Sequence, residues 1–169
     1  KAPETEKIVK SLNNNNDIYL VPAFTGLGAP YWDANARGVL SGITRDTSPK
    51  EIVRATIEAV AYQTFDLFEA MKHDGLRPKI VKVDGGMVMN NWFSQFLSDI
   101  VNVKVLRPKV QETTALGAAF MAGLQIGVYK SLKDISKNWN LDKKFSPKMK
   151  NKSRSLLIKG WAKAVKRAL

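Results

Sequence analysis

The residues best suited to do chemistry form a strand-to-helix turn in the middle of the chain, Val83-Asp84-Gly85-Gly86-Met87. Open α/β sheets bind ligands at the carboxyl ends of their strands, and two glycines let the backbone of such a turn approach a nucleotide closely. The free amides and the dipole of the helix that follows would favour a phosphate. Asn90 lies about one turn further on, and its amide could hydrogen-bond a ribose, a phosphate or a base. The same turn also occurs without a ligand, in which case Asn90 is a helix cap.

Few other groups are available for catalysis. The sequence has no cysteine and a single histidine, which excludes disulfides, thiolate nucleophiles and the usual zinc sites from these 169 residues. The histidine, His73, stands near the expected end of a long helix, where a cation interacts favourably with the dipole. Trp32, Asp33 and Arg37 lie in a glycine-rich loop, and we expect turn formation or a domain contact from them before catalysis. We therefore expect no catalytic residue and no metal ligand in this chain.

The turn must be positioned by the elements on either side of it. Residues 79–84 read KIVKVD, a β-prone run that leads directly into the two glycines. After a cap at Asn90 or Asn91, apolar residues recur on one helical face: Trp92, Phe93, Phe96, Leu97, Ile100 and Val101. A second strand is expected at 103–106, followed by an alanine- and glycine-rich helix whose small side chains would let it sit close to the sheet. The order strand, helix, strand, helix predicts an α/β fold with crossover connections.

Elements further from the turn are also marked in the sequence. A short helix and a loop are expected in residues 1–16, and short strands near 18–21 and 38–43. Ser48, Pro49 and Glu51 form a capping box that predicts a long, core-facing helix ending near Gly75. The expected apolar face of that helix consists of Val53, Ile57, Val60, Ala61, Thr64, Leu67, Phe68 and Met71. A last helix from about Ser153 should dock through its Trp161 side.

The positive charge is concentrated at one end of the sequence. Residues 1–129 hold 14 Lys and Arg against 13 Asp and Glu, whereas residues 130–169 hold 13 against 2. Such a block could attract nucleic acid or another acidic surface. It could also be the solvated face of a helix, and the last twenty residues contain only one aromatic ring, Trp161, for stacking on bases. No segment has the length and hydrophobicity of a membrane span or the pattern of a signal peptide, so we expect a cytoplasmic protein.

Several stretches together resemble a known family. VPAFTGLGAPYWDANARG, GVLSGITRDTSPKEIVRATIEAVAYQ, VDGGMVMNNWFSQFLSDI, ETTALGAAFMAG and GWAKAVKRA are similar to the C-terminal region of glycerol kinases. These enzymes belong to the carbohydrate kinase family that shares the actin-like, ribonuclease-H-like ATPase fold. Residues 38–58 resemble the second signature of that family, and the resemblance extends from about Asp17 to Leu169.

The resemblance implies a function for the turn. Gly85, Gly86, Met87 and Asn90 match the adenosine-binding loop of the family, with Gly86 and Asn90 as the nucleotide contacts. Asp84 is assigned to loop geometry before metal binding. The catalytic base, the phosphate-binding threonines and the glycerol contacts of the family lie upstream of the residues in this chain. The resemblance thus implies a C-terminal fragment that holds the adenosine side of an ATP site, uses ATP or ADP with Mg held mainly elsewhere, and is inactive alone.

We expect three parts along the chain. Residues 1–16 are a polar lead-in, residues 17–129 are part of a nucleotide-binding C-terminal kinase domain, and residues 130–169 are a basic helical extension packed on it. The implied partners are the N-terminal kinase domain, glycerol as substrate of the parent enzyme, and further copies in a homo-oligomer, without membrane or nucleic acid. Two alternatives stay open: the equivalent part of another polyol or sugar kinase, and a module that binds nucleic acid or an acidic surface through the basic tail.

Overall fold

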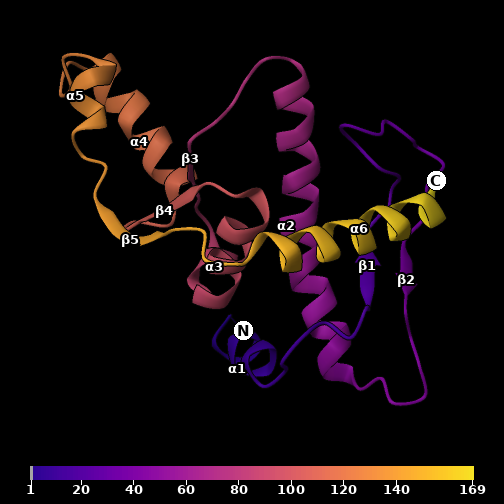
Figure 1. Cartoon of the computed structure of the whole chain (residues 1–169). Coiled ribbons are helices and arrows are strands. Elements are labelled where there is room, and N and C mark those ends of the chain that lie inside the picture. The colour runs from indigo at the N-terminus through magenta and orange to yellow at the C-terminus, as the bar shows by residue number, and fades with distance from the viewer. Residues whose placement is uncertain (1) are drawn as a thin grey trace.

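The computed structural model describes residues 2–169, which form six α-helices, five short strands and one 3-10 turn (Figure 1). The helices are α1 (Ala2–Lys10), α2 (Pro49–His73), α3 (Asn91–Val101), α4 (Thr113–Gln125), α5 (Leu132–Ser136) and α6 (Asn151–Ala168). The strands are β1 (Tyr19–Val21), β2 (Val39–Ser41), β3 (Ile80–Lys82), β4 (Lys104–Pro108) and β5 (Leu141–Phe145), and the 3-10 turn η1 is Gly86–Met89. None of the helices within residues 2–169 is both long and apolar enough to cross a membrane.

The strands form two separate sheets on either side of α2. In the first sheet β3 pairs parallel with β4 through the α3 crossover, and β5 adds antiparallel to β4. In the second, β1 and β2 form an antiparallel pair that lies against α6 (Figure 1). The expected α/β crossover is confirmed. The strand β5 was not predicted, and it makes part of the basic C-terminal segment a member of the sheet.

The start and the end of α2 follow the local signals of the sequence. The Ser48 hydroxyl accepts a hydrogen bond from the amide of Lys50 at 3.2 Å, and the Glu51 carboxylate accepts one from the Ser48 amide at 3.1 Å. The helix ends at His73, and Gly75 follows with φ of +84°. Both boundaries of this 25-residue helix are therefore confirmed.

The buried face of α2 differs from the expected one. Val60, Leu67 and Met71 are 38 to 40% exposed, so the prediction that they face the core was wrong. The helix instead buries Glu58 completely, and the residues one turn before and after it bond to this carboxylate. Arg54 Nε donates to Glu58 Oε1 at 2.7 Å, and the Tyr62 hydroxyl donates to Oε2 at 2.9 Å. A buried carboxylate is tolerated only when it is paired in this way.

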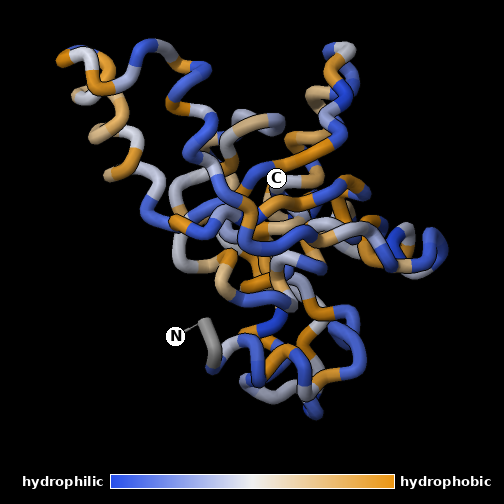
Figure 2. The backbone as a smooth tube through the Cα atoms, turned by 90° about the vertical axis from the view of Figure 1, so that its left-hand side faces the viewer, coloured by the Kyte–Doolittle hydropathy of each residue, from blue (hydrophilic) through white to orange (hydrophobic). Residues whose placement is uncertain are grey.

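The last helix, α6, docks on α2 through Trp161, as predicted. Trp161 is 1% exposed, its ring stacks on Tyr62 with centroids 5.3 Å apart, and its Nε1 donates to Asp66 Oδ2 at 2.7 Å. The preceding Gly160 lies against the Tyr19 ring, since a Cβ atom there would be 2.1 Å from the Tyr19 hydroxyl. Figure 2 shows hydrophobic segments concentrated near the middle of the molecule, where these elements meet.

The alanine- and glycine-rich helix α4 does not pack closely on the sheet, contrary to expectation. Only Gly123 is buried within α4, while Met121 is 51% exposed and Gly117 has open space where a Cβ would stand. The helix projects away from the rest of the chain together with α5 (Figure 1). The small size of Gly123 instead leaves room for the ring of Tyr129, in the loop after α4. The Tyr129 ring also packs edge-on against Phe120.

Candidate nucleotide site

The turn after β3 depends on a glycine conformation and is hydrogen-bonded to the residues around the start of α4. Gly85 adopts φ of +84°, which favours glycine, and its amide donates to the Gln111 carbonyl at 3.3 Å. The Thr113 hydroxyl donates to the Asp84 carboxylate. Asp84 therefore joins this turn to the start of α4, which agrees with a role in loop geometry.

Three of the four predicted site residues line one cavity. Gly86, Met87 and Asn90 surround a space of about 240 Å³ together with Thr5 and Ile57. A Cβ atom on Gly86 would meet nothing within 4 Å, so there is open space beside the backbone of this turn. Gly85 belongs to the same turn but does not line this space. Ligand pockets for whole small molecules usually measure about 300–1,000 Å³, so this cavity suits one end of a ligand.

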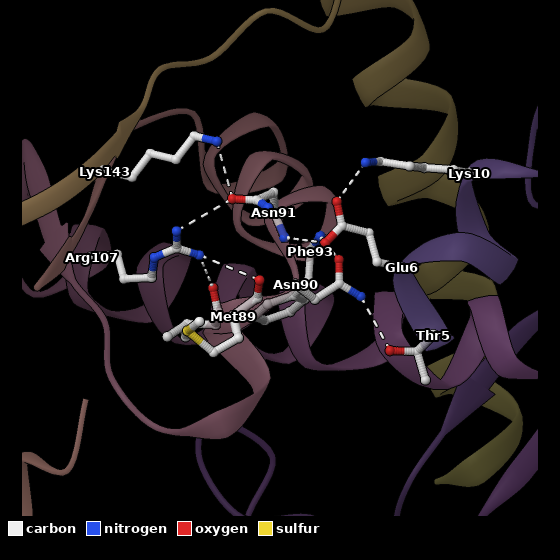
Figure 3. Close-up of polar contacts among 10 residues, drawn as sticks. Thr5, Glu6, Lys10, Met89, Asn90, Asn91, Phe93, Arg107 and Lys143 are labelled. Carbon is white, nitrogen blue, oxygen red and sulfur yellow. Dashed lines mark hydrogen bonds and ion pairs between the residues drawn. The ribbon is translucent and has the colours of Figure 1, made fainter. Parts of the chain in front are cut away.

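Both the oxygen and the nitrogen of the Asn90 side-chain amide form hydrogen bonds within the protein (Figure 3). It is 2% exposed, its Oδ1 accepts from the Phe93 amide at 3.0 Å, and its Nδ2 donates to Thr5 Oγ1 at 3.3 Å. The expected cap of α3 is therefore confirmed. The contact with Thr5 joins residues 85 positions apart, and nothing in the sequence indicated it.

The first amide of α3 binds a carboxylate of the protein itself. The Asn91 amide donates to Glu6 Oε2 at 3.0 Å, and Lys10 Nζ lies 2.5 Å from Glu6 Oε1 (Figure 3). Burial raises the pKa of Glu6, but the hydrogen bonds from Lys10 and Asn91 outweigh it, so the pKa lies below its ordinary value. The expectation that this end of α3 offers free amides to a phosphate was wrong for Asn91 and Phe93, whose amides bind Glu6 of α1 and the Asn90 side chain.

Arg107 of β4 holds the 3-10 turn from the other side. It is 6% exposed, and its Nη1 donates to the Val88 carbonyl at 2.7 Å. Its Nε donates to Asp142 Oδ2 at 2.7 Å, and the neighbouring Lys143 reaches Asn91 Oδ1 at 3.1 Å. Figure 3 shows Arg107 of β4 and Lys143 of β5 converging on Asn91. Sequence reasoning missed this arginine, and its only signal was a second charge, three positions after Lys104, in a short strand that is otherwise apolar.

The other polar candidates have local roles. Asp33 Oδ1 accepts from the amides of Asn35 at 2.7 Å and of Ala36 at 3.1 Å, which makes it a turn-forming residue. Arg37 Nη1 donates to the carbonyls of Ala34 and Ala36. Among the described residues no group of three or more His, Cys, Asp or Glu side chains could hold a metal ion.

Comparison with known proteins places this geometry in a family. The family model for the C-terminal domain of the FGGY carbohydrate kinases matches residues 3–126, which include the turn, the cavity, all of α1 except its first residue, and α2 to α4. The chain belongs to the FGGY family of carbohydrate kinases. This finding confirms the resemblance seen in the sequence, because the match spans more than half of the chain.

Within this family the chain is similar to glycerol kinases. The chain is 54% identical over 166 residues to glycerol kinase 1 of Pseudomonas aeruginosa. The matched region covers 98% of this chain and 34% of the relative. The chain is 52% identical over 169 residues to the glycerol kinase of Thermoanaerobacter pseudethanolicus, covering 99% of this chain and again 34% of the relative. The chain thus spans about a third of the length of the relatives it matches.

Solved FGGY structures have the same fold. The Plasmodium falciparum glycerol kinase with ADP superposes with a TM-score of 0.85 at 38% identity, over 99% of this chain and 34% of that one. The gluconate kinase of Lactobacillus acidophilus superposes with a TM-score of 0.75 at 25% identity, over 97% of this chain and 33% of that one. The chain therefore has the actin-like ATPase fold of sugar kinases, as the sequence predicted.

Proposed function

We propose that this chain is the C-terminal third of an ATP-dependent glycerol kinase, which phosphorylates glycerol to glycerol 3-phosphate. The observation that carries the proposal is identity above 50% to glycerol kinases over nearly the whole chain. The alternative, that the chain belongs to another sugar kinase, has weaker support, because identity to the gluconate kinase structure is only 25%. The basic residues of α6 belong to a helix that is docked on the fold through Trp161, so a separate nucleic-acid module is not favoured.

Within that enzyme, we assign the adenosine side of the ATP site to Gly85, Gly86, Met87 and Asn90. The cavity at Gly86 supports this assignment, because it is open at the glycine backbone and sized for one end of a nucleotide. Phosphoryl transfer to a primary hydroxyl depends mainly on positioning and on neutralising the charge of the transferred group. The proposed contribution of this chain is positioning, while Mg and the proton-accepting group belong to the rest of the enzyme. We expect no glycerol phosphorylation by the chain alone.

The partner of this chain is proposed to be the rest of the kinase, docked on the open side of the sheet. The strand β3 is at the edge of its sheet, and its Ile80 is 50% exposed. On α4 and in the loop after it, Met121, Ile126 and Val128 are 51 to 77% exposed. An open edge and an apolar surface of this kind are normally covered. We further propose that the full enzyme is a cytoplasmic homo-oligomer.

The test of the site separates nucleotide binding from helix capping at Asn90. In the complete kinase, Asn90→Ala removes both functions of the side chain, whereas Asn90→Ser keeps a cap and removes the amide donor. We expect both variants to raise KM for ATP by about tenfold, since losing one hydrogen bond costs about 1 kcal/mol or slightly more, and to leave KM for glycerol nearly unchanged. Steady-state kinetics with each substrate varied in turn measure this.

The two variants also show how the assignment could fail. If Asn90→Ser has the KM for ATP of the unmodified kinase while Asn90→Ala does not, Asn90 acts only as the cap of α3. If both variants raise the two KM values together, the effect is a general loss of structure. Either result removes Asn90 from the nucleotide site.

A further inference from the structure

A second and larger cavity lies at the other end of α2. It measures about 510 Å³ and is bounded by the last turns of α2, the loop at 76–78, the end of α3 with the two residues after it, and the first half of α6. It shares no lining residue with the cavity at Gly86, which touches α2 only at Ile57. Its volume is within the range of small-molecule sites.

Four cations line this cavity against a single carboxylate. The cations are Lys72, Arg77, Arg154 and Lys159, and the carboxylate is Glu69. Glu69 forms its ion pair with Lys72, at 3.4 Å. Within residues 2–169, none of the other three cations has a carboxylate within ion-pair distance. The cavity therefore has an excess of positive charge that the fold does not neutralise.

Arg154 is the cation whose position is best defined. Its Nε donates to the Ile100 carbonyl at 2.7 Å, and its guanidinium lies over the Phe65 ring, 5.4 Å from the centroid. Burial lowers the pKa of Arg154, and the nearby Glu69 charge offsets this only in part. A guanidinium anchored through Nε keeps its two Nη groups for bidentate hydrogen bonds to a phosphate or carboxylate.

The walls between these cations are apolar. Phe65, Phe68, Val101 and Ile158 line the same space, so the charged groups share the cavity with two aromatic rings. A simple hydrated anion would leave these walls in contact with water. A ligand with an anionic head and a flat or apolar body would satisfy both parts of the lining.

We propose that this cavity binds a small organic phosphate, with Arg154, Arg77 and Lys159 around the phosphate and the organic part against Phe65 and Phe68. A phosphate carries close to two negative charges at neutral pH and offers several acceptor oxygens, which matches three unpaired cations. The site is separate from the proposed adenosine site, so ligands could occupy both at once.

The experiment titrates the intact protein with three probes at constant ionic strength, using calorimetry or NMR shifts of the Phe65 region. Phenyl phosphate carries both halves of the proposed ligand, whereas inorganic phosphate and phenol carry one half each. We expect phenyl phosphate to bind at least tenfold more tightly than either. The double variant R77Q/K159Q, which changes two exposed side chains, should weaken phenyl phosphate binding about tenfold.

The matched control is K166Q/R167Q, which also removes two exposed cations and lies in the last turn of α6, outside the cavity. It should leave phenyl phosphate binding unchanged. Equal weakening by K166Q/R167Q and by R77Q/K159Q would show diffuse attraction to basic residues, and would overturn the proposal. Absence of phenyl phosphate binding at millimolar concentration, or equal binding of inorganic phosphate, would overturn it as well.

Discussion

Replacing Arg54 by methionine is expected to destabilise the protein by about 3–5 kcal/mol, because it leaves a buried carboxylate without its countercharge. Glu58 is fully buried, and Arg54 Nε at 2.7 Å is its closest cationic donor. Arg54 also donates through Nη1 to the Leu12 carbonyl at 2.8 Å and lies over the Trp92 ring at 5.0 Å. The variant should therefore also loosen the chain after α1, the helix that supplies Thr5 to the candidate site.

The stability lost by Arg54→Met should increase as pH rises. Burial raises the pKa of Glu58, and Arg54 lowers it, so the variant removes an opposing contribution and raises the pKa further. A carboxyl whose pKa is higher in the folded than in the unfolded state loses stability as pH rises through that interval. Urea unfolding should show that Arg54→Met lowers the free energy of unfolding, relative to the unmodified protein, by more at about pH 8 than at about pH 5.

A second substitution identifies the cause of the effect. In Arg54→Met/Glu58→Leu both charges are gone, and replacing a buried pair by apolar residues is often close to neutral. The double variant should recover most of the stability that the single variant loses, and its unfolding should not share the pH dependence. A single variant that costs less than about 1 kcal/mol would mean that water or a rearrangement reaches Glu58.

Trp161→Ala is expected to cost about 3–5 kcal/mol, as truncation of a fully buried aromatic residue usually does. The side chain is 1% exposed, stacks on Tyr62 and donates to Asp66 at 2.7 Å. Asp66 also accepts from the Tyr31 hydroxyl at 2.8 Å, so one carboxylate joins α6, α2 and the loop around Pro30. Burial raises the pKa of Asp66, and its two donors offset part of that rise.

Two companion variants make the Trp161 result specific. Trp161→Phe keeps most of the ring area and removes the donor to Asp66, so it should have an intermediate effect. Leu156→Ala, on the exposed side of the same helix at 61% exposure, should stay within about 0.5 kcal/mol. If urea midpoints for Trp161→Ala and Leu156→Ala are alike, α6 is not anchored through Trp161.

The parts of the fold that could be predicted are those whose cause is local in sequence. The caps at Ser48 and Asn90 are set by residues three positions apart, and the turn at Gly85 by a conformation that few other residues adopt. These signals were sufficient to find the α2 and α3 boundaries and the turn of the candidate site.

The parts that could not be predicted depend on contacts distant in sequence. Thr5 and Glu6 reach Asn90 and Asn91 across 85 positions, and no pattern within α1 indicates that partner. Strand β5 has four exposed residues of five, so it lacks the alternation that marks a half-buried strand. The burial of Glu58 is likewise visible only once Arg54 and Tyr62 are placed around it.

The helix α4 illustrates a different limit. Its alanines and glycines indicate that close packing is sterically possible, but they do not say which surface is packed. Within the described chain, Gly123 packs against Tyr129 in the loop that follows the helix, and the rest of the helix is largely exposed. Residue size in a helix is therefore weaker evidence for a contact than a cap is for a boundary.

The central claim, that the turn at Gly85 and Gly86 forms the adenosine side of an ATP site, is tested most directly by photolabelling. The complete kinase is irradiated with an azido-adenine analogue of ADP, with and without excess ADP, and the labelled peptides are mapped by mass spectrometry. The account predicts ADP-protected label within residues 83–91, with Met87 as the expected acceptor, since it is 37% exposed beside the cavity. ADP-protected label confined to other segments, with residues 83–91 unmodified, would contradict it.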